Sequence, residues 1–262
     1  MTIFSHEIKQ NRKMLIIWSL SVGLLMVTCM MLYPQMQSQM EDINKMYSSM
    51  GSFSEAFGMD KLNFGTVMGF YGIECGNILG IGGAFFAAMV GISMLSKEES
   101  GHTAEFLLTH GVSRKRIVSE KLLAVLTIIV VFNAICIGLS AISFKFIGEE
   151  IATKEFLLFH LAQFIMQCEL AFICYGISSY IKRGGNGIGI GIASLGYFLN
   201  IILNISDKAQ WLKYVTPFAY SDAADILSKA EIKWDLIGIG IFYAIAGAAI
   251  GFWQYCKKDI VS

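Results

Sequence analysis

The chain has 262 residues, of which 55% are hydrophobic, with a mean hydropathy of +0.59 and two prolines. That is more apolar surface than one soluble core would bury, so the composition excludes an ordinary soluble domain and predicts an all-α membrane protein. Twenty Lys and Arg residues balance twenty Asp and Glu residues, and this net charge of zero gives no reason to expect a nucleic-acid partner.

Six long apolar segments predict membrane-spanning helices. The first runs from Met14 to Tyr33 without a charged side chain. Twenty helical residues rise about 30 Å, the thickness of the hydrocarbon core of a bilayer. We expect a single transmembrane domain over residues 1–262 with spans at 14–33, 66–95, 120–147, 155–181, 187–205 and 236–256.

The first thirteen residues predict a short interfacial helix that leads into the first span. One face carries apolar side chains, and the charged side chains can stay among the headgroups: Phe4, Ile8 and Leu15 against Glu7, Lys9 and Arg12. A signal peptide is disfavoured because the apolar run is long and the residues after it lack a small-residue cleavage pattern. A merely solvated tail remains the alternative.

An even number of spans places both termini on one side of the membrane. Twelve of the twenty basic residues fall on that side: Lys9, Arg12, Lys13, Lys97, Arg114, Lys115, Arg116, Lys121, Lys182, Arg183, Lys257 and Lys258. The positive-inside rule then predicts cytoplasmic termini.

The first outer segment, residues 34–65, carries an apolar stripe typical of an amphipathic helix. Its members recur at steps of three and four residues: Met36, Met40, Ile43, Tyr47 and Met50. The stripe can pack on the chain's own spans, or it can lie on the outer leaflet or contact an amphipathic cargo.

The second outer segment, residues 206–235, combines charges with aromatic residues that suit a membrane interface: Trp211, Tyr214, Phe218, Tyr220 and Trp234. We expect two short helices there, bent at Pro217, which enter the interface without crossing the membrane.

Glycines are dense in the second span. Small residues four positions apart let two membrane helices approach closely. Gly69 lies four residues after Gly65, and Gly72, Gly76 and Gly80 follow one another at this spacing. Gly187 and Gly191, and Gly247 and Gly251, repeat it in the fifth and sixth spans.

Ionisable groups inside a membrane are costly and face the bundle interior or a watery path. Four such polar residues form a candidate substrate path: Glu74, Asn77, His160 and Glu169. We expect Asn77 to hydrogen-bond Glu74, and Gln163 and Gln167 to hydrogen-bond Glu169. A role in translocation and a role in holding helices together both remain open. No metal site is predicted, because the six cysteines lack metal-ligand spacing.

The most specific segment lies between the second and third spans. It reads, in order, Glu98-Glu99, Gly101, Glu105-Phe106-Leu107-Leu108, Gly111-Val112-Ser113-Arg114 and Lys121. This pattern resembles the permease subunits of the type-2 ABC transporter family, although that family more often has proline where Gly111 stands. Thr216-Pro217-Phe218 and the ending Lys257-Lys258-Asp259-Ile260 are also similar to that family.

The resemblance implies that this loop forms a short cytoplasmic coupling helix, at about 103–109, that docks on a separate nucleotide-binding subunit. The residues implied in the contact are Glu98, Glu99, Gly101, Glu105, Phe106, Leu107, Leu108 and Arg114. The chain contains no Gly-Lys pair and so has no phosphate-binding loop of the usual kind. ATP and Mg²⁺ are therefore expected on the partner, and six spans imply a second permease copy, giving a homodimer that contacts membrane lipid.

We therefore expect a non-enzymatic exporter permease in a plasma membrane. The chain resembles exporters of small amphipathic or antimicrobial peptides in Gram-positive bacteria, including the phenol-soluble modulin exporters. A lipid-like cargo, a sodium or drug extrusion permease and an ion channel remain alternatives. An intramembrane enzyme is disfavoured because the sequence has no His-Glu-x-x-His and no Gly-x-Gly-Asp motif.

Overall fold

The computed structural model describes residues 2–97, 112–181 and 185–257. Over these ranges the regular structure is entirely helical, without a strand. Six helices are long and apolar enough to cross a membrane. The predicted all-α fold with six spans is confirmed.

The six spans agree with the predicted segments to within a few residues at most ends. They are α1 (Thr2–Met36), the continuous stretch of α4 (Val67–Phe70), η2 (Tyr71–Cys75) and α5 (Gly76–Ser93), α8 (Arg114–Ile147), α9 (Thr153–Ser178), α10 (Asn186–Ile205) and α13 (Trp234–Lys257). The largest differences are at two starts: α1 begins at Thr2 and not near residue 14, because the predicted N-terminal helix is continuous with the span, and α8 begins at Arg114 and not near residue 120.

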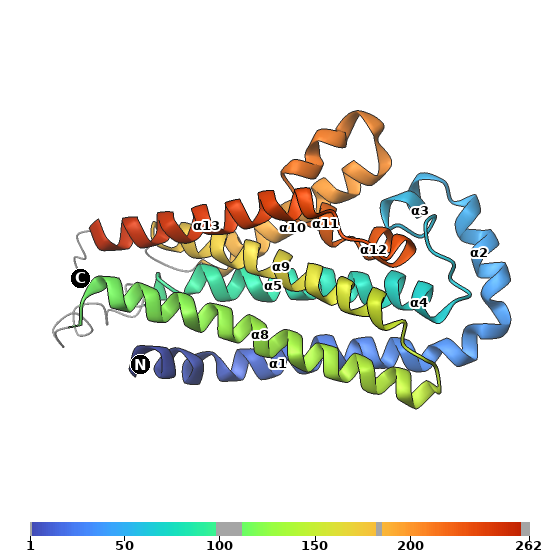
Figure 1. Ribbon diagram of the computed structural model, residues 1–262, viewed down its shortest axis with the longest axis horizontal. Coiled ribbons are helices and arrows are strands. Elements are labelled where there is room, and N and C mark those ends of the chain that lie inside the picture. The colour runs from blue at the N-terminus through green and yellow to red at the C-terminus, as the bar shows by residue number, and fades with distance from the viewer. Residues whose placement is uncertain (1, 98–111, 182–184, 258–262) are drawn as a thin grey trace.

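The long helices run side by side along the longest axis of the molecule (Figure 1). The N-terminal end of α1 and the C-terminal end of α13 lie at one end of this bundle, here called the terminal end. The short helices α2, α3 and α12 lie at the opposite end, here called the far end. The first described helix therefore begins, and the last one ends, on the same side, as an even number of spans requires.

The N-terminal residues are helical, as predicted, but they continue into α1 without a break. The expectation that Glu7 stays among the headgroups is wrong, because its side chain is only 1% exposed. The Nζ atom of Lys121 lies 2.6 Å from the Glu7 carboxylate, and Lys97 pairs with the same group. These two ammonium groups offset the free-energy cost of removing the charged carboxylate from water.

Helix α9 packs between α5 and α13 through direct backbone contacts. A Cβ atom on Gly91 of α5 would lie 2.9 Å from the carbonyl carbon of Ala171, and one on Gly247 of α13 would lie 2.8 Å from the Cα atom of Ile173. Only a residue without a side chain fits at such positions. These contacts provide the close approach between spans that small residues make possible in lipid.

The four glycines singled out in the second span face other partners. A Cβ atom on Gly69 would lie 2.7 Å from the carbonyl carbon of Asn63, and one on Gly76 would lie 2.6 Å from the Cβ atom of Ala223. Gly72 faces Leu227, and Gly80 faces the amide of Gln163 on α9. Three of the four therefore make room for connecting segments at the far end.

The first connecting segment folds as η1 (Gln37–Gln39), α2 (Met40–Ser49) and α3 (Ser52–Ala56). Along the predicted stripe, Met40 is buried and the ring of Tyr47 lies 5.3 Å from that of Phe64. This face packs on the chain itself, while Met50 at its end is exposed.

The second connecting segment forms three short helices and not two: η3 (Asp207–Tyr214), α11 (Phe218–Ser221) and α12 (Ala223–Lys229). Trp211 and Trp234 are exposed, as interface anchors would be. Phe218 and Tyr220 are buried instead, because α11 packs against α9 and α10.

We predict that Gly247→Ala lowers the thermal unfolding midpoint of the purified protein, because the new methyl group meets the α9 backbone. Overpacking of this kind costs about 1–3 kcal/mol. The control is Gly238→Ala on the same helix, where a Cβ atom would meet nothing within 4 Å. Equal midpoints for the two variants would contradict the backbone contact.

Candidate functional site

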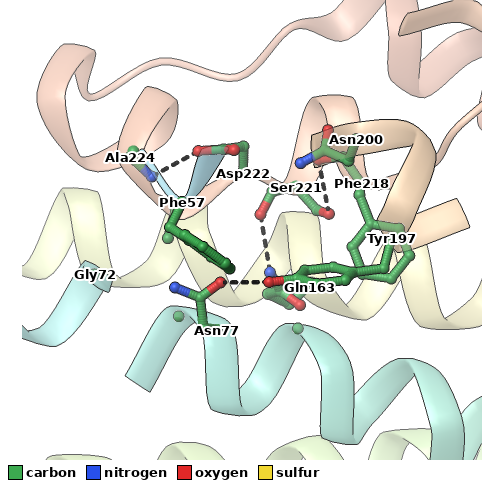
Figure 2. Close-up of a pocket in the computed structure, with 13 residues that line it drawn as sticks. Phe57, Gly72, Asn77, Gln163, Tyr197, Asn200, Phe218, Ser221, Asp222 and Ala224 are labelled. Carbon is green, nitrogen blue, oxygen red and sulfur yellow. Dashed lines mark hydrogen bonds between the residues drawn. The ribbon is translucent and has the colours of Figure 1, made fainter. Parts of the chain in front are cut away.

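A small polar cavity lies between α5, α9, α10 and the α11–α12 segment, toward the far end. We call it the amide cavity, because the side-chain amides of Asn77, Gln163 and Asn200 border it (Figure 2). Its volume is about 40 Å³. The full lining is Phe57, Gly72, Gly76, Asn77, Gly80, Gln163, Tyr197, Asn200, Phe218, Ser221, Asp222, Ala223 and Ala224.

The second span shapes one wall of the amide cavity. Its π-helical turn η2 leads into Gly76, and π turns of this kind often occur at functional sites. The Nδ2 atom of Asn77 donates to the Ile73 carbonyl at 2.7 Å, and its Oδ1 atom accepts from the Tyr197 hydroxyl at 3.2 Å. Asn77 thereby joins the second span to α10.

Two amides leave polar atoms without a partner at this cavity. The Nε2 atom of Gln163 donates to the Ser221 carbonyl at 2.8 Å, but its Oε1 atom is buried without a partner. Asn200 is 7% exposed, and its Oδ1 atom is also buried without a partner. A buried polar atom without a hydrogen bond costs about 1–3 kcal/mol. The arrangement therefore favours a molecule that can donate to both oxygens.

The size of the amide cavity limits what it holds in this conformation. About 10–15 Å³ is enough for one water molecule, so the cavity has room for water but not for a peptide segment. A larger cargo would require the α11–α12 segment to move away from α5 and α9.

A larger, charged cavity of about 260 Å³ adjoins the amide cavity and shares Asn200 and Asp222 with it. Its lining includes three lysines and two aspartates: Lys61, Lys213, Lys233, Asp222 and Asp225. The charges are of both signs and neither dominates strongly. A ligand with both polar and charged groups would fit this lining better than a purely apolar one.

Asp225 joins α12 to neighbouring segments of the far end through two ion pairs. The Nζ atom of Lys61 lies 3.1 Å from Oδ1 of Asp225, and the Nζ atom of Lys233 lies 2.5 Å from Oδ2. Burial raises the pKa of Asp225, but the nearby ammonium groups of Lys233 and Lys61 outweigh this effect and lower the pKa below its ordinary value. The ionised carboxylate therefore holds α12 in place.

Of the four predicted path residues, Asn77 lines the amide cavity and the others lie elsewhere. The side chain of Glu74 is partly buried, and no hydrogen bond or ion pair joins it to the described part of the chain. His160 is buried, and its Nε2 atom lies 2.8 Å from the Tyr71 hydroxyl. Glu169 is 2% exposed and accepts from the Tyr220 hydroxyl at 2.6 Å.

The predicted hydrogen bonds to Glu74 and Glu169 are wrong. The amide of Asn77 bonds Ile73 and Tyr197 instead of Glu74. Gln167 accepts from Asn133 on α8 at 2.7 Å, because it lies on a different side of α9 from Glu169. Positions two apart do not face each other on a helix.

Sequence reasoning missed Tyr197 and the turn at Ser221 and Asp222. Tyr197 reaches the amide cavity because α10 packs against α5, whereas Ser221 and Asp222 reach it only because the second connecting segment folds back onto α9. No local pattern in the sequence signals that return. The tight hydrogen bond of Tyr220 to Glu169 helps to hold it.

Most of the expected coupling residues lie outside the described residues: Glu98, Glu99, Gly101, Glu105, Phe106, Leu107 and Leu108. Arg114 is described, and it opens α8. Its Nη1 atom donates to the Cys256 carbonyl at 3.4 Å, which joins the start of α8 to the end of α13. Among the described residues, no three His, Cys, Asp or Glu side chains gather as metal ligands.

Comparison with known families identifies the class of protein. The family model described as ABC-2 family transporter protein matches residues 1–260. The chain belongs to this family and is a multi-pass membrane permease, the non-catalytic membrane component of an ABC transporter that works with a nucleotide-binding subunit. Searches of curated proteins and of solved structures gave no match.

We predict that Asp225→Asn lowers the thermal unfolding midpoint at neutral pH. The loss in the free energy of unfolding should be at most about 1 kcal/mol, because the ion pairs of Asp225 are partly exposed. Because the folded-state pKa is depressed, the stabilisation is present above the ordinary pKa of 3.8 and is lost as the pH falls through the lower folded value. The difference between wild type and variant should therefore vanish at acid pH. The matched control is Asp207→Asn, at an exposed aspartate of the same segment. A difference that persists unchanged into acid would contradict this role of Asp225.

Proposed function

We propose that this permease exports an amphipathic cargo, either a peptide or a lipid-like molecule, through a path that includes the amide cavity. The observation that carries the proposal is the pair of unpartnered amide oxygens, on Gln163 and Asn200, that border the amide cavity. A peptide backbone supplies N–H donors for both oxygens. The adjoining charged cavity offers lysines and aspartates to its charged side chains.

The terminal end faces the cytoplasm in this proposal, because the predicted inner segments hold most of the basic residues. The nucleotide-binding subunit, with its ATP and Mg²⁺, docks there on the loop that contains residues 98–111. The far end then faces the outside, and cargo leaves where the α11–α12 segment covers the amide cavity. Three contacts must loosen for this exit: Gln163 to Ser221, Glu169 to Tyr220, and Asp225 to its two lysines.

We further propose that two identical copies form the complete path. Helix α10 supports this, because positions Gly187 and Gly191 are open and Leu195 and Phe198 are exposed. Such a face allows close approach of a second helix in lipid. The setting that fits best is the plasma membrane of a Gram-positive bacterium, where the peptide exporters that the chain resembles are found.

The proposal is tested by reconstituting the permease with its nucleotide-binding subunit in lipid vesicles. The probe is a fluorescent synthetic amphipathic helix of leucine and lysine, and a fluorescent phospholipid serves as the second probe. ATP-dependent movement of the peptide supports peptide export, and movement of the phospholipid alone supports a lipid-like cargo. ATP hydrolysis without movement of either probe would refute an amphipathic cargo.

We predict that Asn200→Leu reduces ATP-dependent transport of the moving probe about tenfold, the effect of one lost hydrogen-bonding group of about 1.4 kcal/mol. Assembly with the partner should persist, because the Asn200 Oδ1 atom has no partner to lose. Phe242→Leu, at an exposed position of α13 outside the proposed path and dimer face, serves as the control. Equal transport by both variants would remove the amide cavity from the path.

We predict that Glu105→Lys and Phe106→Asp leave insertion of the permease intact but separate ATP hydrolysis from transport. If this segment docks in a groove of the partner subunit, the reversed charge of Glu105→Lys or the new charge of Phe106→Asp should weaken that contact. The measurement is the amount of probe transported per ATP hydrolysed. Lys9→Gln, at an exposed residue, serves as the control variant. Normal coupling in both variants would contradict a docking role for this loop.

A further inference from the structure

The terminal end contains a buried carboxylate that the transport path does not explain. Glu7 of α1 is 1% exposed, and Lys121 of α8, which pairs with it, is fully buried. The Nζ atom of Lys121 lies 2.6 Å from Oε1 of Glu7 and also donates to the Met94 carbonyl at 2.9 Å. Lys97 pairs with the other carboxylate oxygen of Glu7 and donates to Gln10 at 2.5 Å.

These side chains come from three different spans. Glu7 belongs to α1, Lys97 follows the end of α5, and Lys121 lies within α8. Lys97 directly precedes residues 98–111 in the chain, and α8 begins just after them. Glu7 therefore pairs with one residue before and one residue after the loop on which, in the proposed function, the nucleotide-binding subunit docks.

A second carboxylate strengthens the same junction. Glu120 of α8 accepts from the backbone N–H of Phe4 at 3.0 Å and from Nε of Arg116 at 2.8 Å. Two acidic groups thus join the start of α1 to α8: Glu7 on α1 pairs with Lys121, and Glu120 on α8 accepts from Phe4. A displacement of Lys97 or of the start of α8 would therefore displace α1 as well.

Stability alone is a weak reason for such a cluster. Replacing a buried ion pair by apolar residues is often neutral or stabilising, because taking both charges out of water is expensive. A buried pair does, however, fix one geometry strongly, since loss of either partner leaves an unpaired charge. That property suits a link between moving parts.

We infer that Glu7 is a positioning residue that transmits movement of Lys97 and Lys121, which flank residues 98–111, to α1 and α8. The contacts of α1 with α5 and of α8 with α9 carry this movement to the amide cavity. The inference rests on the proposed function. In this role Glu7 acts through Lys97 and Lys121, the two ammonium groups that pair with it. Without it, the partner subunit would still bind ATP, but the far end would no longer respond.

The experiment uses the whole complex and does not depend on the cargo. A Ser221→Cys reporter in the amide cavity is labelled from outside with a membrane-impermeant maleimide, with and without ATP and vanadate. The parent chain, whose cysteines lie in or at the ends of the spans, gives the background. With Glu7 and Lys97 intact, trapping the nucleotide should raise the labelling rate about fivefold or more.

The same increase should be absent in Glu7→Gln and in Lys97→Gln, and the double variant should lose no more than either one, because contacting residues act as a unit. The exposed Lys9→Gln on the same helix should keep the increase. If Glu7→Gln fails to assemble, Lys97→Gln decides, since Lys97 is partly exposed and its loss leaves Glu7 paired with Lys121.

Two other outcomes are distinct. If the reporter responds equally in wild type and in Lys97→Gln, the inference is wrong while the proposed function stands. If trapping changes nothing even with Glu7 and Lys97 intact, the proposed opening of the amide cavity is itself wrong, and this inference fails with it.

Discussion

The backbone contacts of α9 with α5 and α13 set the spacing on which the rest of the bundle depends. Gly91 and Gly247 bring the neighbouring backbones to within van der Waals distance of α9. Lipid supplies no hydrophobic drive to push helices together, so close packing of this kind provides much of the attraction. With α9 fixed in this way, Gln163 and Glu169 face the segment that returns from α10.

The polar groups of the bundle follow from the absence of water in the hydrocarbon core. Tyr71 meets His160, Asn133 meets Gln167, and Tyr220 meets Glu169, each through a contact of 2.8 Å or less. Asn133, His160 and Gln167 each keep another buried atom without a partner, but only the unpartnered oxygens of Gln163 and Asn200 border the amide cavity. This contrast separates the amide cavity from the polar contacts that hold helices together.

The sequence was sufficient to predict features that depend on local composition. The apolar lengths gave the six spans, and charge gave a consistent topology, because both depend on residues close together in the chain. The burial of Glu7 could not be predicted, since its partners Lys97 and Lys121 lie on other spans. The amide cavity was missed for the same reason: Ser221 meets Gln163 only when the second connecting segment folds back. Burial of Tyr220 likewise depends on Glu169, a residue far from it in sequence.

The most direct measurement is co-purification of the tagged chain from its native membrane in mild detergent, followed by an ATPase assay with amphipathic peptides. We predict a stoichiometric ATP-binding partner whose ATP turnover responds to amphipathic peptide. A partner whose turnover ignores amphipathic peptides would contradict the peptide part of the proposal. Purification of the intact permease without an ATP-binding subunit would contradict the central claim that ATP hydrolysis at the terminal end drives export through the far end.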